Sequence, residues 1–341
     1  MSAAALLSPA AAVAGRGAAV ERAPFATGRA GGPLRDGFLL VAPGLIWSAS
    51  FLFIAEALQA IGPYGLTFAR ILVGFGLLGL LPAARRPVAR TDWARVALLG
   101  VIWLAFPLTM FPLAEQRVSS ALTGMLNGAN PLFTAVVAAA MTRRLPSRRV
   151  GAGLAVGLLG VALVALPSLD EGRSSVTGVL LILAALTGYG FAINVTQPLQ
   201  QRYGALPVLW RAQAVALVLT APLGLPELVA ARWTAPALLS LLLLGALGTG
   251  VAYVLLAIAA GRLGTTRASA TTFLIPPVAL LLGVAVRGEQ VALLSVVGGA
   301  VCVAGAWVMR RAQTLAPRSA LPAVGFPDHP PGPSNTLHNA S

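Results

Sequence analysis

The sequence contains no lysine, one cysteine and two histidines, and only 10% of its 341 residues are charged. Without lysine there is no Walker A phosphate loop, which needs that residue at the nucleotide phosphates. Cys302 lies in the last apolar segment, where a small buried hydrophobic residue is expected. His329 and His338 lie in the polar C-terminal region, so neither a metal site nor a histidine-based catalytic centre is indicated. We therefore expect no enzymatic activity and no cofactor.

Apolar residues dominate the composition instead. They make up 57% of the chain, and the mean hydropathy is +0.83. A soluble domain keeps about a quarter of its residues charged, so this composition indicates a surface that faces lipid. The formal net charge of +14 would suggest nucleic acid in a soluble protein, but here the arginines lie in loops and tails, where they orient a membrane protein. We expect a lipid bilayer as a partner and no nucleic acid.

Ten apolar stretches of about 20 residues are each long enough to cross a bilayer as an α-helix. The predicted spans are 37–59, 63–81, 93–113, 118–141, 149–167, 176–198, 205–223, 235–260, 265–286 and 290–309. The flanking regions 1–35 and 312–341 lack a trustworthy helical pattern, and they are predicted to be disordered cytoplasmic tails. The sequence thus predicts an all-α polytopic membrane protein.

The arginines alternate between abundant and scarce from one loop to the next. Eighteen lie in tails and loops on one predicted side, and four lie on the other side, at positions 117, 173, 232 and 287. The remaining two, Arg70 and Arg211, fall inside predicted helices. Because arginine-rich loops stay in the cytoplasm, this bias predicts that both termini are cytoplasmic. It also predicts a multi-pass location in the cell membrane.

The predicted helices divide into two halves, 36–168 and 176–311, joined by an extracellular linker at 169–175. A shift of 146 residues aligns Pro131 with Pro277 and Gly153 with Gly299. Five helices per half place the two copies in opposite orientations. Inverted repeats of this kind occur in many secondary transporters, whose substrate site lies near the midplane between the halves.

Short motifs in matching order also carry a family resemblance. They are Gly44–Phe51, Arg70, Ala121 to Asn130-Pro131, Arg144-Leu145, Gly248–Tyr253, Arg262–Gly264, Pro277, Gly288-Glu289 and Gly298-Gly299. Together they resemble two EamA repeats of the drug/metabolite transporter superfamily, over about residues 38–311. The resemblance implies a ten-helix secondary transporter that exports small metabolites or drugs. One departure is Arg143, which stands where this family often has the acidic residue that Glu289 provides in the second half; we interpret that basic loop as a topology anchor.

Apart from arginines at the first residues of a span, three charged residues are expected inside the membrane, where such residues are costly unless they are paired or hydrated. Glu56 and Arg70 lie at similar predicted depths, so an ion pair between them is expected. Glu56 is our candidate for proton coupling, with a static bridge at the membrane surface as the alternative. Arg70 is a candidate for substrate binding or gating, whereas Arg211 is expected to extend toward the headgroups.

Uncharged polar and aromatic residues complete the predicted substrate cavity. With Arg70, its candidates are Trp47, Ser50, Asn127, Asn130, Tyr189, Asn194, Tyr253 and Thr272. Asn127 and Asn130 flank a predicted helix break before Pro131, and Thr272 precedes the matching break at Pro276-Pro277. The alternative for all of these side chains is hydrogen bonding and close packing between helices.

The function expected from these features is proton-coupled export of a small molecule by alternating access. Uptake or facilitated exchange of a metabolite is an alternative within transport. A non-transporting membrane scaffold or sensor is an alternative of another class. The expected partner is a small-molecule substrate, and a homodimer is left open.

Overall fold

A computed structural model describes residues 33–170, 172–263 and 268–315, and these residues form helices and no strand. The α-helices are α1 (Pro33–Ala57), α2 (Pro63–Gly79), α3 (Trp93–Leu99), α4 (Phe106–Glu115), α5 (Ser120–Asn127), α6 (Asn130–Thr142), α7 (Arg148–Ala165), α8 (Pro167–Asp170), α9 (Arg173–Tyr203), α10 (Ala205–Ala230), α11 (Ala235–Leu243), α12 (Ala252–Leu263), α14 (Ile275–Arg287) and α15 (Leu293–Leu315). Two π-helical segments, η2 (Gly100–Ala105) and η3 (Leu244–Val251), and two 3₁₀ turns, η1 (Arg90–Asp92) and η4 (Ser269–Leu274), connect them.

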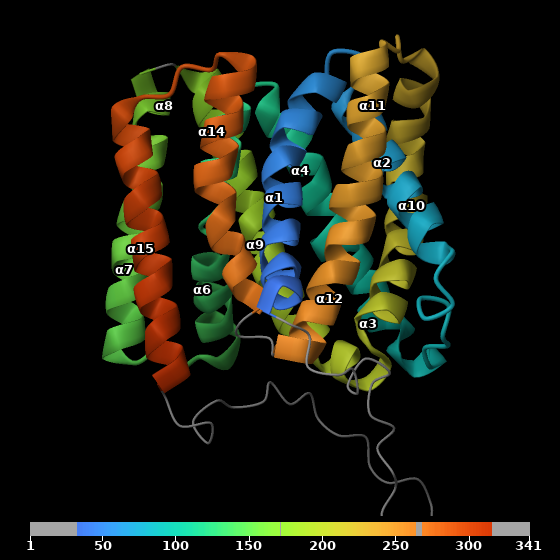
Figure 1. The fold of residues 1–341 in the computed structure, drawn as a ribbon, viewed down its shortest axis with the longest axis horizontal. Coiled ribbons are helices and arrows are strands. Elements are labelled where there is room, and N and C mark those ends of the chain that lie inside the picture. Colours follow the sequence, from blue (N-terminus) through green and yellow to red (C-terminus); the bar gives the residue numbers. More distant parts are fainter. Residues whose placement is uncertain (1–32, 171, 264–267, 316–341) are drawn as a thin grey trace, which may run out of the picture.

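The helices run side by side between two ends where the connections lie (Figure 1). Among the described residues, eight continuous helical runs are long and apolar enough to cross a membrane, and two shorter apolar helices are Pro63–Gly79 and Asn130–Thr142. An all-α polytopic architecture is thus confirmed. The number ten stays a prediction, because the second and fourth predicted spans correspond to these shorter helices.

Several predicted boundaries need correction. Residues 33–35 and 312–315, assigned to disordered tails, are helical because they continue α1 and α15, and extending an existing helix needs no new nucleus. The rest of both predicted tails lies outside the described residues. The predicted linker at 169–175 is partly helical, since it contains the end of α8 and the start of α9.

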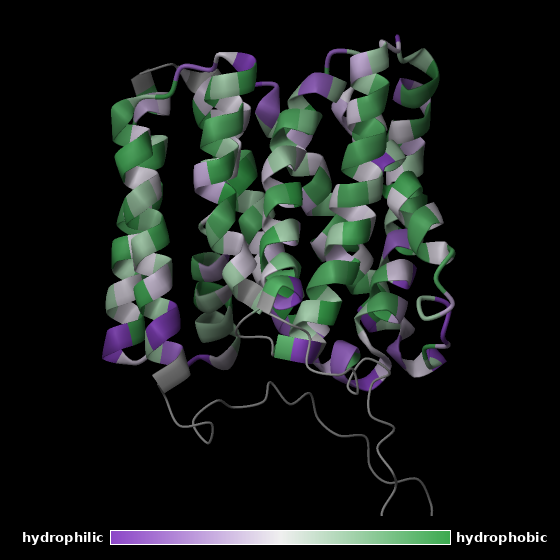
Figure 2. Ribbon diagram, viewed as in Figure 1, coloured by the Kyte–Doolittle hydropathy of each residue, from purple (hydrophilic) through white to green (hydrophobic). Residues whose placement is uncertain are grey.

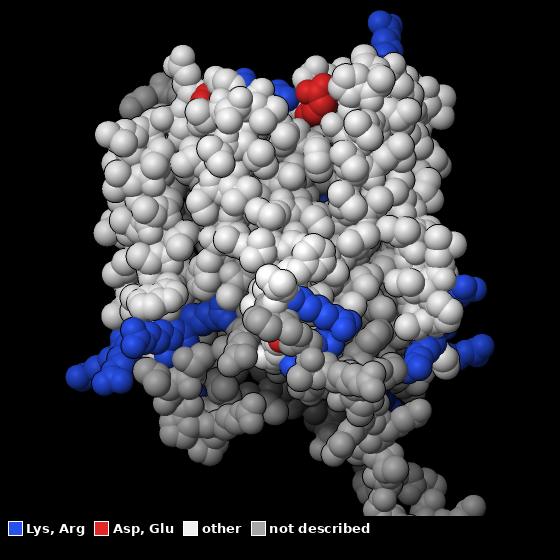
Figure 3. Space-filling model, in the orientation of Figure 1, with Lys and Arg blue, Asp and Glu red and all other residues white. Residues whose placement is uncertain are grey.

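The two ends of the bundle differ in charge. Apolar residues fill the middle of the molecule, and polar residues gather at its two ends (Figure 2). Most of the arginines seen in Figure 3 form a belt around one end. We call this the basic end; α2, α6 and α9 end and α7 begins there, which brings to it Arg85, Arg143, Arg144, Arg148, Arg149 and Arg202. The other end, called the opposite end, carries Glu56, Glu227 and Glu289.

The helices of the two halves pack against each other in pairs. In the described residues, α2 packs on α10, α4 on α9, α5 on α14 and α7 on α15. The two π-helical segments also correspond, because the shift of 146 residues carries 100–105 onto 246–251, within η3. A π segment is rare and often marks a functional site. Its recurrence at matching positions supports the internal repeat more strongly than the sparse sequence identity does.

Glycines allow α7 and α15 to approach until their backbones touch. A Cβ added to Gly298 would lie 2.5 Å from the backbone nitrogen of Val164, and one on Gly160 would collide with the backbone of Cys302. Ser295 also donates from Oγ to the carbonyl of Val164 at 2.9 Å. Close contact of this kind is how membrane helices associate without a hydrophobic driving force between them.

The contact between α7 and α15 should be sensitive to a single added side chain. We expect Gly160→Val to destabilise the protein by about 1–3 kcal/mol, because backbone atoms of Cys302 cannot move aside cheaply. Gly151→Val is the matched control, since it lies on the same helix with nothing within 4 Å of the added Cβ. Thermal unfolding of the purified protein in detergent measures both variants. Equal midpoints for the two variants would contradict this packing argument.

Candidate functional site

The centre of the candidate site is the wide turn η3. Two backbone carbonyls of this turn accept hydrogen bonds from side chains on other helices. Trp47 on α1 donates from Nε1 to the carbonyl of Gly248 at 3.0 Å. Gln213 on α10 donates from Nε2 to the carbonyl of Thr249 at 2.9 Å, while its own Oε1 is buried without a hydrogen bond. The bond from Trp47 therefore links the two halves at the π turn, and the bond from Gln213 fastens α10 to it within the second half.

Arg70 lies directly against this turn. It projects from α2, is only 5% exposed, and donates from Nε to Oγ1 of Thr249 at 3.3 Å. Glycines bring the backbones together here: a Cβ on Gly74 would lie 2.9 Å from the side chain of Thr249, and one on Gly245 would lie 3.0 Å from the carbonyl oxygen of Arg70. The terminal nitrogens Nη1 and Nη2 make no hydrogen bond to the part of the chain that is described. A buried guanidinium is thus left with donors free for an anionic group.

Aromatic side chains surround the guanidinium. Tyr253 on α12 lies edge-on to Trp47 and to Trp103, with ring centroids 5.4 Å and 5.6 Å apart. Phe111 on α4 contacts Tyr189 on α9, with centroids 5.9 Å apart. Both tyrosines interact electrostatically with Arg70. Trp103 belongs to η2, so the π segment of the first half contributes to this aromatic wall.

The structure brings part of the predicted cavity together. Trp47, Ser50, Arg70 and Tyr253 meet around Gly248: a Cβ on that glycine would lie 2.8 Å from Oγ of Ser50. Ser50 itself donates from Oγ to the carbonyl of Ile46 one turn earlier in α1.

Other predicted residues lie at breaks or elsewhere in the bundle. Asn127 ends α5 and is buried, and Asn130 begins α6 with its Oδ1 buried and without a hydrogen bond. Thr272 lies in η4, at the matching break before α14. Asn194 donates to the carbonyls of Gly190 and Thr134 at 2.8 Å and 3.2 Å, and so fastens α9 to α6. These side chains are not joined to Arg70 by any hydrogen bond among the described residues.

The predicted ion pair between Glu56 and Arg70 is wrong. Glu56 pairs with Arg287 at 3.3 Å and accepts a hydrogen bond from Gln59 at 3.1 Å. The prediction compared only the depths of the two residues along their helices. In the structure Glu56 faces the end of α14, whereas Arg70 faces η3.

Arg211 bonds to backbone carbonyls close to the basic end. Its guanidinium donates to the carbonyls of Ala84, Arg85 and Pro207 at 3.1–3.4 Å. Two of these carbonyls belong to the turn that follows α2, where a cation compensates the negative end of the helix. The residue thus fastens α10 to the end of α2 and lies away from the central turn.

Glu115 was missed, because the predicted third span stopped at residue 113. The helix continues through Pro112, and Glu115 is the last residue of α4. Both of its carboxyl oxygens are buried and make no hydrogen bond. One signal in the sequence could have found it: Glu115 lies only two residues beyond the predicted span. The chain has only ten acidic residues, so each of them is worth considering as a functional candidate.

Two other carboxyl groups join the halves at the opposite end. Glu289 accepts hydrogen bonds from the backbone nitrogens of Ser120 and Ala121 at 3.1 Å and 2.8 Å, and from Oγ of Ser120 at 2.7 Å. Glu227 accepts one from the nitrogen of Gly65 at 2.7 Å. Both carboxylates thus satisfy the free amides at a helix N-terminus, where negative charge is favoured.

Polar contacts also join the halves at the basic end. Asp92 pairs with Arg202 at 3.0 Å and accepts a hydrogen bond from Tyr203 at 2.6 Å. Asp36 pairs with Arg262 at 3.5 Å. The Arg70 site therefore lies between two sets of cross-half contacts, one at each end.

Comparison with known proteins agrees with this arrangement. The EamA-like transporter family matches the chain twice, at residues 37–166 and 176–311. A protein of Streptantibioticus cattleyicolor named "Probable terminal-alkyne amino-acid exporter" is 31% identical over 278 residues, which cover 80% of this chain and 92% of that protein. The "Uncharacterized transporter YdfC" of Bacillus subtilis is 28% identical and covers 76% of this chain and 86% of that one.

A solved crystal structure shares the fold with a TM-score of 0.56. It is 17% identical, and the match covers 80% of this chain and 96% of that chain. At this identity the likeness concerns the fold alone, while the two family matches cover most of the sequence. The chain is a multi-pass membrane protein that belongs to the EamA-like transporter family.

Proposed function

We propose that this protein exports a small amino-acid-like metabolite by alternating access, with the Arg70 site as its substrate site. The observation that carries the proposal is the buried guanidinium of Arg70, which has free donors and stands between the two halves. A carboxylate is the group that such a guanidinium binds most strongly. Buried charge of this kind in a membrane segment marks a functional site by default.

The surroundings of Arg70 fit the rest of an amino acid. Oε1 of Gln213 is a buried acceptor without a partner, and an ammonium group would supply the missing donors. Trp47, Trp103 and Tyr253 offer an aromatic surface for an apolar side chain. The relative from Streptantibioticus cattleyicolor, which is named a probable terminal-alkyne amino-acid exporter, supports the same class of substrate.

Alternating access is supported by the paired construction of the bundle. The halves meet through α2–α10, α4–α9 and α5–α14, and short-range polar contacts join them at both ends. Rocking one half against the other would break one set of contacts at a time around a fixed central site. Within this proposal the other cavity residues, Ser50, Asn127, Asn130, Tyr189, Asn194 and Thr272, line the route or support the helix breaks beside it.

The proposed orientation places the basic end in the cytoplasm. The arginine belt at that end follows the positive-inside rule (Figure 3). With the two short helices Pro63–Gly79 and Asn130–Thr142 counted as spans, the bundle has ten spans and both termini are cytoplasmic. Export then needs an energy source, and we propose the proton gradient. Uptake or facilitated exchange is the alternative direction, which transport measured from both sides distinguishes.

Substitution of Arg70 tests the substrate site. In proteoliposomes loaded with propargylglycine, a terminal-alkyne amino acid, we expect Arg70→Ala to lower the transport rate by at least about tenfold, since the lost contact joins two charged groups. Arg86→Ala, an exposed arginine at the basic end, is the control and should retain the wild-type rate. The wild type should prefer the free acid to its amide, and Arg70→Ala should lose that preference. A wild-type transport rate in Arg70→Ala would contradict the proposal.

Labelling in intact cells tests the orientation. In a background with Cys302→Ala, we expect Gln290→Cys at the opposite end to react with a membrane-impermeant maleimide from outside. Arg144→Cys at the basic end should react only after the cells are permeabilised, because both positions are exposed but lie on different sides. Labelling of Arg144→Cys in intact cells would reverse the proposed orientation.

A further inference from the structure

We propose that Glu115, and not Glu56, carries the proton that drives export. This inference rests on the proposed function, because it names the coupling residue of the same transport cycle. It is carried by the burial of this carboxyl, by its lack of a partner and by the outer cavity beside it.

Glu115 differs from the other acidic side chains that pack into the described part of the bundle. Glu56, Asp36 and Asp92 form ion pairs, and Glu227 and Glu289 accept backbone hydrogen bonds. The oxygens of Glu115 have neither kind of partner. A carboxylate buried without a hydrogen bond or counter-ion is strongly destabilised, and binding a proton removes its charge.

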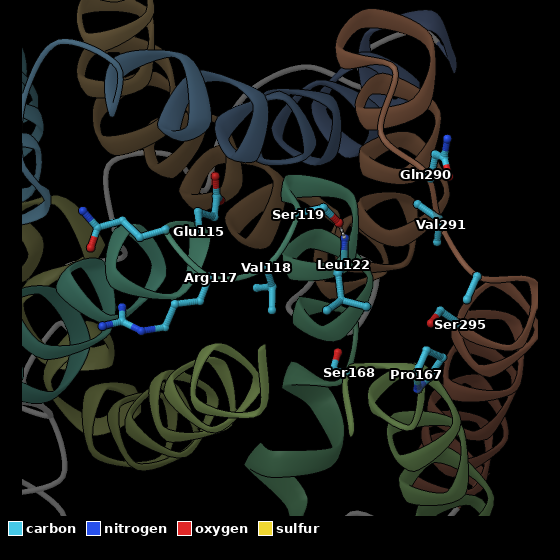
Figure 4. A pocket seen from close by; sticks show the side chains of 12 residues that line it. Glu115, Arg117, Val118, Ser119, Leu122, Pro167, Ser168, Gln290, Val291 and Ser295 are labelled. Atoms are coloured by element: carbon cyan, nitrogen blue, oxygen red, sulfur yellow. Dashed lines mark hydrogen bonds between the residues drawn. The ribbon is translucent and has the colours of Figure 1, made fainter. Parts of the chain in front are cut away.

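Within the described ranges, no basic residue forms an ion pair with this carboxyl. Arg117, two residues away, donates instead to the carbonyl of Leu113, and Arg287 is engaged with Glu56 and Glu289. In Figure 4 the carboxyl of Glu115 is turned away from Arg117.

The charged groups that face Glu115 come from several packed elements. Arg70 faces it from α2, Arg287 from the end of α14, and Glu289 from the loop after α14. Tyr189 is the titratable residue of α9 at the level of Arg70, and Glu56 of α1 reaches the group only through Arg287. Neither α5 nor η2 carries an ionisable side chain. Glu115 therefore interacts with the charge of the substrate site and with the polar contacts of the opposite end.

A cavity of about 220 Å³ lies beside this residue, and the two carboxyl oxygens are enclosed, so a proton reaches them from the cavity when the outer end opens. Glu115 lines it together with Ser119, Ser168, Gln290 and Ser295 (Figure 4). These polar groups belong to the end that the proposed orientation places outside the cell. A cavity of this size and polarity holds water, which can deliver a proton.

The proposed step is a reversible protonation. A hydronium ion in the outer cavity gives its proton to the ionised carboxyl of Glu115, which leaves one water molecule and a neutral acid. After the halves rock, the proton leaves to water on the cytoplasmic side, and the carboxylate is restored. One proton then enters the cell as the substrate leaves it, and Glu115→Gln would remove the group that makes this exchange.

Infrared spectroscopy tests the proton site without any substrate. A protonated carboxyl shows a C=O stretching band that a carboxylate lacks. In lipid-reconstituted protein titrated with acid and base, we expect one such band to be absent in Glu115→Gln and present in Glu56→Gln. Identical titrations of the wild type and Glu115→Gln would overturn the proposal. So would loss of the band in Glu56→Gln alone.

Gradient-driven transport tests the coupling. With propargylglycine as the probe, we expect an imposed pH gradient to accelerate export by the wild type and by Glu115→Asp. Glu115→Gln should lose this acceleration by at least about tenfold while the purified protein keeps its thermal midpoint. Acceleration that persists in Glu115→Gln overturns the coupling role. If the wild type does not move the probe under any gradient, the proposed function fails instead, and the infrared arm still reports on Glu115.

Discussion

The backbone of a membrane helix has no water to bond with, and this constraint shapes the whole protein. Each break in a helix exposes carbonyls or amides that another group must satisfy. At η3 the carbonyls of Gly248 and Thr249 receive Trp47 and Gln213. At the start of α5 the free amides receive Glu289. Gln213 belongs to the same half as η3, whereas Trp47 and Glu289 each reach a break in the other half, so these two contacts hold the halves together.

The same constraint explains why polar residues lie where they do. The carbonyls of an unbroken helix are occupied by its own backbone amides, whereas the π turn leaves carbonyls free to accept hydrogen bonds from Trp47 and Gln213. Arg70 follows the same logic, because Nε bonds to Thr249 within the wide turn while the rest of the guanidinium stays free. The site is thus a consequence of a locally widened helix. Its counterpart η2 brings Trp103 to the same place from the first half.

The sequence predicted the class of fold and part of the site, for a clear physical reason. The length of the apolar stretches and the distribution of arginines can be read directly along the sequence. The structure has long apolar helices and one arginine-rich end, as these two features predicted. The family motifs led to Trp47, Arg70 and Tyr253, which do meet. Pairings between helices depend on the direction in which each side chain faces, which depth along the chain does not determine. That is why Glu56 was matched with Arg70, whereas Glu115 was missed because the predicted third span ended at residue 113.

The cross-half contacts at the two ends differ in a way that matters for rocking. At the basic end Arg202 is mostly exposed, so its bond to Asp92 is worth little against water. At the opposite end Glu289 is largely enclosed and holds three donors of α5, and Arg287 links it to Glu56. In the proposed cycle, opening that end would separate Glu289 from α5, and water would then have to accept the hydrogen bonds of all three donors. The buried carboxyl of Glu115 lies close enough to Glu289 and Arg287 to change the cost of that step, since a negative charge there would repel one and attract the other. In the proposed transport cycle, protonation of this one carboxyl would bias which end of the bundle opens.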